Sequence, residues 1–190
     1  MGENRVGAWS WIPCLYFLEG LPNTVVMTVS VLFYTSLGMS ATSVAALTSA
    51  LYLPWVIKPF WSPLVDTVST KRKWILACAL AFALAFFALS ISPFSENWAM
   101  LSIAGFWFLG ISSATFDIAA DGFYMLALST QNQAFFVGIR SSFYRLSMIF
   151  GNGGLLYIAG RKMGLGDCVF CLCHCFLNRI FLVFKVFAKP

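Results

Sequence analysis

Long apolar runs separated by short polar turns are the feature that most constrains the fold of this chain. An α-helix needs about 20 predominantly apolar residues to cross the hydrocarbon core of a bilayer. Five runs of about that length or longer are bounded by polar or charged residues, at 8–36, 41–65, 74–93, 98–128 and 134–160. We therefore predict an all-α, polytopic transmembrane helix bundle of five to six helices.

The composition excludes an ordinary soluble domain. Charged residues make up 10% of the 190 positions and hydrophobic residues 60%, whereas a soluble domain carries about a quarter charged residues. The net charge of +5 comes from cations concentrated at 71–73 and near the C-terminus, not from a stripe with interleaved aromatics. We therefore expect the lipid bilayer as a partner and no nucleic acid.

The distribution of lysine and arginine predicts the orientation in the membrane. Short cytoplasmic loops carry an excess of these residues. With the N-terminus in the cytoplasm, Arg5 and the 71–73 cluster lie inside, and the first two outer loops hold no lysine or arginine. Arg161 and Lys162 fall on the outer side, but the count favours a cytoplasmic N-terminus.

The chain divides into a helical bundle, 1–162, and an atypical tail, 163–190. Four cysteines follow Asp167 within eight residues, and three further cations follow them. One hypothesis is a truncated or frameshifted sixth helix. The cysteines and His174 are crowded too closely for an ordinary tetrahedral zinc site, so we expect no metal and no other cofactor. No nucleophile–base arrangement or phosphate-binding loop is present, which argues against an enzyme.

Six ionisable side chains lie inside the predicted spans, where each costs about 2.5–3.5 kcal/mol or more without a partner. Residues of adjacent helices lie at equal depth when they are equidistant from the turn between them. Taking turn centres between Gly38 and Met39 and at Gln131, this rule predicts three acid–base pairs: Glu19 with Lys58, Asp117 with Arg145, and Asp121 with Arg140.

Two interpretations of these charges remain open. In the functional one, they line a water-filled route, bind an anionic or polar solute and include a carboxylate that takes up a proton. In the structural one, the pairs only neutralise one another and hold helices together. Asp117 and Asp121 share one helix face because they are four residues apart. Pro22 beside Glu19 favours a backbone that lines a cavity, whereas Lys58 and Arg140 could instead extend toward the headgroups.

Four segments together resemble AmpG-type permeases of the major facilitator superfamily, with the closest likeness to bacterial, Bacteroides-type members. They are 16–22 (YFLEGLP), 51–66 (LYLPWVIKPFWSPLVD), 113–124 (SATFDIAADGFY) and 144–146 (YRL). The resemblance covers about residues 10–160. It implies the N-terminal half of a twelve-helix protein in the cell inner membrane, with the solute bound between two halves. It also implies proton-coupled import of cell-wall-derived muropeptides or related sugar–peptide compounds, so that the missing C-terminal half, a small solute and protons would be partners.

The same resemblance covers the loop after the second predicted helix. The superfamily signature there is a glycine, an aspartate four residues later and following basic groups. Asp66, Lys71 and Arg72 stand at the expected positions, while Ser62 and Ser69 replace the two glycines. The resemblance implies that Asp66, Lys71 and Arg72 latch the cytoplasmic side during alternating access. A plain positive-inside loop would explain the cations but not Asp66.

Two rival functions remain. The chain could be a fragment that transports nothing without a second half, or a membrane assembly or scaffold module whose charges serve only helix association.

Overall fold

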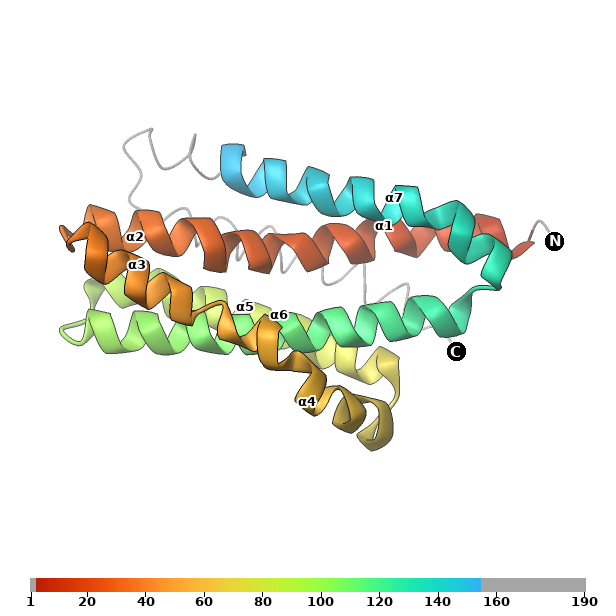
Figure 1. The fold of residues 1–190 in the computed structure, drawn as a ribbon, viewed down its shortest axis with the longest axis horizontal. Helices are drawn as coiled ribbons and strands as arrows, with labels where there is room; N and C mark the ends of the chain where they lie inside the picture. The colour runs from red at the N-terminus through yellow and green to blue at the C-terminus, as the bar shows by residue number, and fades with distance from the viewer. Residues whose placement is uncertain (1–2, 155–190) are drawn as a thin grey trace.

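The structure, a computed structural model, describes residues 3–154, and all the regular structure in that range is helical (Figure 1). The elements in chain order are α1 (Glu3–Thr24), the π-helical turn η1 (Val25–Val29), α2 (Ser30–Ser36), α3 (Ala41–Ala50), α4 (Leu53–Val68), α5 (Lys71–Ile91), the 3₁₀ turn η2 (Ser92–Phe94), α6 (Trp98–Ala127), α7 (Thr130–Ile149) and the π-helical turn η3 (Phe150–Gly154). The cysteine-rich tail expected at 163–190 lies outside the described residues.

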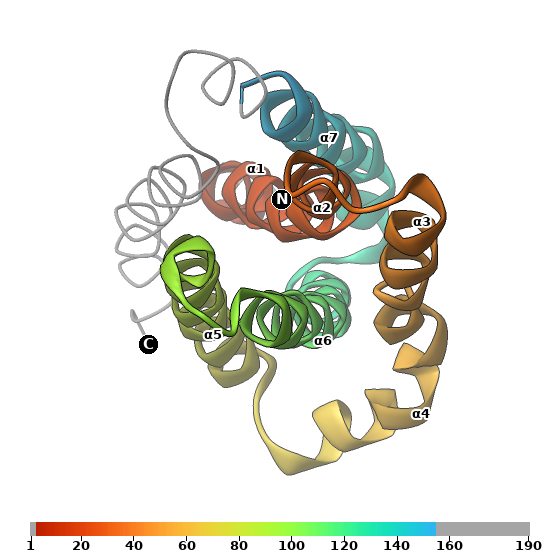
Figure 2. The same ribbon diagram turned by 90° about the vertical axis from the view of Figure 1, so that its left-hand side faces the viewer.

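The helices form two long pairs crossed by a broken third layer. α1 packs along α7, and α5 packs along α6, while α6 also contacts α1 (Figure 2). α3 packs against α2, α4 runs obliquely across α6, and the far end of α4 diverges from the bundle (Figures 1 and 2). Each helix therefore has particular lateral neighbours, and these decide which charged side chains meet.

The first rod, α1–η1–α2, continues through a wide turn instead of remaining α-helical throughout. Pro22 lies within α1 one turn before η1 and has no backbone N–H to donate. Thr24 Oγ1 donates to the Gly20 carbonyl at 2.9 Å, and Ser30 Oγ donates to the Val26 carbonyl. Such side-chain bonds help to satisfy carbonyls where the helical pattern changes. Gly38 ends the rod with a φ of 78°, a conformation that favours glycine.

The range expected for the second helix, 41–65, contains two helices in the structure. Ser40 caps α3 by accepting a hydrogen bond from the Ser43 N–H at 3.3 Å. α3 ends at Ala50, and Pro54 cannot supply the N–H that would bond the Ala50 carbonyl. The apolar pattern runs across this break because burial depends on side chains, whereas the break arises from the proline backbone.

Three helical segments in the described range have the length and apolar composition to cross a membrane. They are Gly7–Ser36, Lys71–Phe94 and Trp98–Ala127, with mean hydropathies of 1.3, 2.5 and 1.5. The other two expected runs do not meet these limits in the described range. One is divided between α3 and α4, which are each too short, and the described part of the other, 130–154, is long enough but not apolar enough, since it carries Arg140 and Arg145. Phe60 and Leu126 are 87% and 78% exposed, and exposed apolar surface of this kind is typical of membrane or partner-contacting faces.

A seam of very close backbone contact joins α1 to α7 and η3. A Cβ atom on Gly20 would lie 2.9 Å from both the Tyr144 carbonyl oxygen and Ser147 Oγ. A Cβ on Gly151 would lie 2.8 Å from the Thr24 side chain. Small residues of this kind allow membrane helices to approach closely. The seam holds the backbone beside Glu19 directly against α7.

Candidate functional site

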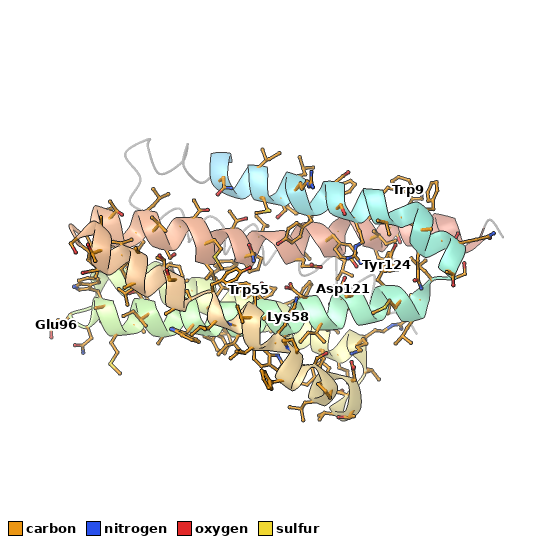
Figure 3. All side chains as sticks on the ribbon, in the orientation of Figure 1. Trp9, Trp55, Lys58, Glu96, Asp121 and Tyr124 are labelled. Atoms are coloured by element: carbon orange, nitrogen blue, oxygen red, sulfur yellow. The ribbon has the colours of Figure 1, made fainter. Side chains whose placement is uncertain are left out.

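The charged side chains of four helices gather near the middle of the bundle. Lys58 of α4 and Asp121 of α6 lie there, whereas Glu96 lies in the turn at one end of the molecule (Figure 3). α6 supplies Asp117 and Asp121 one helical turn apart, and two alanines lie between them. This spacing places both carboxylates on one face of α6.

Asp121 belongs to a three-residue network that joins α1, α6 and α7. Arg140 Nη1 lies 3.0 Å from Asp121 Oδ1. The Tyr16 hydroxyl donates to the same carboxylate oxygen at 3.0 Å and accepts a hydrogen bond from Arg140 Nη1 at 3.1 Å. The guanidinium also lies over the Tyr16 and Tyr124 rings, at 4.9 and 5.2 Å from their centroids. Hydrogen bonds to both charges and cation–π contacts hold Arg140 in place.

Asp117 pairs with Lys58. The Lys58 Nζ atom lies 3.5 Å from Asp117 Oδ2, and the Asp117 side chain is 14% exposed against 36% for Lys58. The pair therefore joins α4 to α6 and keeps the more buried carboxylate close to a cation. Lys58 is directed to an acid inside the bundle instead of only toward headgroups.

Glu19 interacts electrostatically with members of both ion pairs but belongs to neither pair. The residue is 9% exposed, and its Oε2 atom is buried with no hydrogen-bond partner among the described residues. Electrostatic interactions reach it from two acids and two bases, namely Asp117, Asp121, Arg140 and Lys58. A buried carboxyl without a partner is costly unless it is neutral or a ligand pairs with it.

Arg145 opens onto a cleft beside Glu19. The cleft has a volume of about 400 Å³ and is lined by Tyr16, Glu19, Arg140, Ser141, Tyr144, Arg145 and Met148. Arg145 is exposed, and over residues 3–154 it forms no ion pair with an acid. The cleft therefore presents a carboxyl and a guanidinium that form no ion pair within the described part of the chain.

The structure confirms one of the three predicted acid–base pairs and corrects two. Asp121 meets Arg140 as expected. The predicted pairing of Asp117 with Arg145 is wrong, because α7 packs along α1 whereas α4 packs along α6 and brings Lys58 to Asp117. The predicted pairing of Glu19 with Lys58 is wrong for the same reason. The distance of each group from its turn predicted its depth in the bundle, but the lateral packing of the helices decided which groups form ion pairs.

The loop between α4 and α5 forms a second charged contact. Lys71 Nζ donates to Asp66 Oδ1. The Lys71 side chain also lies against Gly122 of α6, where a Cβ atom would come within 2.6 Å of Lys71 Cε. Arg72 lies over the Phe123 ring at 5.7 Å. All three residues expected in the loop signature thus lie at the end of α6 that carries Asp121.

Three tyrosines at or beside the cleft are the site residues that the sequence interpretation missed. Tyr16 and Tyr124 contact Arg140, and Tyr144 lines the cleft. Their spacing in the sequence could have identified two of them, because Tyr16 precedes Glu19 by three residues and Tyr124 follows Asp121 by three. Residues three apart lie on neighbouring parts of one helix face.

Comparison with models of protein families identifies the family of this chain. Residues 14–182 match the model of the Major Facilitator Superfamily. The chain belongs to the major facilitator superfamily. This superfamily member is accordingly a multi-pass membrane protein of a transporter family, and its described helices form part of the superfamily's helix bundle. The match continues through most of the segment that we expected to be an atypical tail.

Individual relatives of this superfamily member include AmpG-like proteins, as the resemblance predicted. It is 27% identical, over 91% of its length, to a Rickettsia conorii protein named "Putative transporter AmpG 4", and covers 42% of that relative. It is 26% identical, over 76% of its length, to the Rickettsia felis protein of the same name, and covers 36% of it. A Haemophilus influenzae protein is 26% identical over 75% of the chain. The chain thus spans less than half the length of these relatives. No solved structure matches it.

Proposed function

We propose that the chain forms the N-terminal part of a transporter that moves a small solute across the cell inner membrane by alternating access, coupled to protons. A cell-wall-derived muropeptide or a related sugar–peptide compound is the proposed solute. One observation carries the proposal: of the charges gathered at mid-bundle, Glu19 and Arg145 have no ion-pair partner over residues 3–154 and face one cleft. A cluster serving only helix association would leave no such group unpaired.

The proposed roles follow from the contacts of each side chain. Asp117 or Glu19 binds a proton when the cleft faces outside and releases it inside. Protonation of Asp117 would remove its attraction to Lys58 and so loosen α4 from α6. Arg145 would hold an acidic group of the solute, while Asp121 and Arg140 keep α6 and α7 in place around the cleft.

The remaining assignments complete the proposal. The N-terminus lies in the cytoplasm, so that Asp66, Lys71 and Arg72 latch the cytoplasmic ends of α4, α5 and α6. The cleft lies open on the face of α1 and α7, and a C-terminal half would close it. The lengths of the relatives, which are more than twice the matched region, support this partner.

Uptake of a labelled muropeptide driven by a proton gradient tests the proposal. The chain is joined to, or co-expressed with, a C-terminal half and reconstituted in vesicles. We expect Glu19→Gln and Asp117→Asn each to reduce the rate of proton-driven uptake at least tenfold. A tenfold change in rate corresponds to about 1.4 kcal/mol in activation free energy. Glu96→Gln is the matched control, because Glu96 is exposed at the end of the bundle. Normal coupled uptake by both site variants rules the proposal out.

The same experiment addresses the rival functions. A fragment that transports nothing by itself would gain uptake only with the C-terminal half present. A scaffold module would leave uptake unchanged whether or not the chain is present.

A further inference from the structure

Two groups of opposite charge face the cleft, and the protein pairs neither of them. Glu19 is 9% exposed, and its Oε2 atom has no partner in the described part of the chain. Arg145 is exposed on α7 and lines the same cleft. The cleft therefore holds one acid and one guanidinium without an ion-pair partner in the described residues, while its other cation, Arg140, is paired with Asp121.

The nearby cations are already engaged. Arg140 bonds Asp121 and the Tyr16 hydroxyl and lies against two aromatic rings. Lys58 lies beside Asp117. Removing either cation to pair with Glu19 would strand a second carboxylate, which costs more than it gains in a site of low polarity.

We propose that the cleft binds a zwitterionic solute, with the ammonium group at Glu19 and the carboxylate at Arg145. An ammonium group supplies the hydrogen-bond donors that Glu19 lacks, and a guanidinium can hold a carboxylate through two parallel N–H bonds. The volume of about 400 Å³ falls within the range of about 300–1,000 Å³ found for small-molecule sites. Tyr144 and Met148 also line the cleft and provide contacts for the part of the solute that joins its two charges.

This inference rests on the proposed function and deepens it. With Glu19 assigned to the ammonium group, Asp117 is the carboxyl group that carries the proton. The charge pattern of the solute and the coupling to protons thus depend on different side chains, and different experiments separate them.

Four matched probes test the charge pattern on the chain joined to a C-terminal half, as in the uptake assay, and purified in lipid nanodiscs. They are alanylalanine, its N-acetyl derivative, its C-terminal amide and the doubly blocked N-acetyl amide. Isothermal titration measures the affinity of each. We expect alanylalanine to bind at least about tenfold more tightly than either singly blocked probe, because each block leaves one protein charge unpaired. The doubly blocked probe should bind most weakly.

Two variants assign each end of the solute. Glu19→Gln should abolish the preference over the N-acetyl probe but keep the preference over the amide. Arg145→Gln should do the reverse. Glu96→Gln and Lys73→Gln are the controls, because both residues are exposed and neither lines the cleft. If Glu19→Gln does not fold, the probe series on the unchanged chain and on Arg145→Gln still decides.

Three results would overturn the inference: equal affinity for the four probes, no binding of any probe at millimolar concentration, or site variants that keep the full pattern of preferences. Failure of the proposed function has a different signature. If the charge preference is present but Asp117→Asn leaves proton-driven uptake normal, the solute site stands and the proton coupling falls.

Discussion

The contact between Gly20 and α7 makes a quantitative prediction about Gly20→Ala. The added Cβ atom would lie 2.9 Å from the Tyr144 carbonyl oxygen, about 0.5 Å inside the 3.4 Å at which ordinary contact begins. That oxygen is backbone, so relief requires α1 and α7 to separate. Overpacking of this kind costs about 1–3 kcal/mol, against a gain of up to about 1 kcal/mol in helix propensity.

Gly138→Ala is the matched control. Gly138 lies within α7, and an added Cβ there would meet nothing within 4 Å. The control should therefore keep the propensity gain, and Gly20→Ala should be less stable than Gly138→Ala by about 1–3 kcal/mol. Thermal unfolding in detergent, followed by circular dichroism, measures the difference. Equal stability of the two variants, or greater stability of Gly20→Ala, would refute the close-contact reasoning.

Two further substitutions test the polar contacts. Tyr16→Phe should lose about 1–3 kcal/mol, because its hydroxyl bonds two charged groups. The exposed Tyr52→Phe should change stability by less than about 0.5 kcal/mol, and indistinguishable melting of the two variants would count against the network. Lys58→Met should lose about 1–3 kcal/mol, since it strands Asp117. Adding Asp117→Asn should recover most of that loss, and purely additive effects in the double-mutant cycle would show that the pair is not coupled.

The sequence predicted what depends on pattern along the chain. Sparse charge and long apolar runs indicated an all-helical membrane bundle, and the residues of four segments indicated the superfamily. The level of the charged groups followed from their distance to the turns, and the pairing of Asp121 with Arg140 was confirmed. These features need only helix length and rise per residue.

What the sequence did not predict depends on lateral neighbours. Lys58 and Glu19 were expected to meet because their helices are consecutive, but α4 packs on α6 and α1 packs on α7. Nothing in a single helix specifies which of several neighbours it will touch. The break before Pro54 was also missed, because the apolar run continues through it while the backbone pattern does not.

The wide turn η1 divides the first rod into two parts that could turn independently. Each residue of an α-helix advances about 100° around the helix axis. If the wide turn at Val25–Val29 changed by the rotation of one residue, α2 would rotate about its axis by roughly that angle while Glu19 stayed in place. Contacts to α6 fix the rotation of α2 in the structure. The Tyr34 hydroxyl lies 3.2 Å from Ser102 Oγ, and the Phe33 ring packs edge-on against the Phe106 ring. The α2 end of the rod is therefore held against α6 by one side-chain hydrogen bond and two aromatic contacts to Phe106.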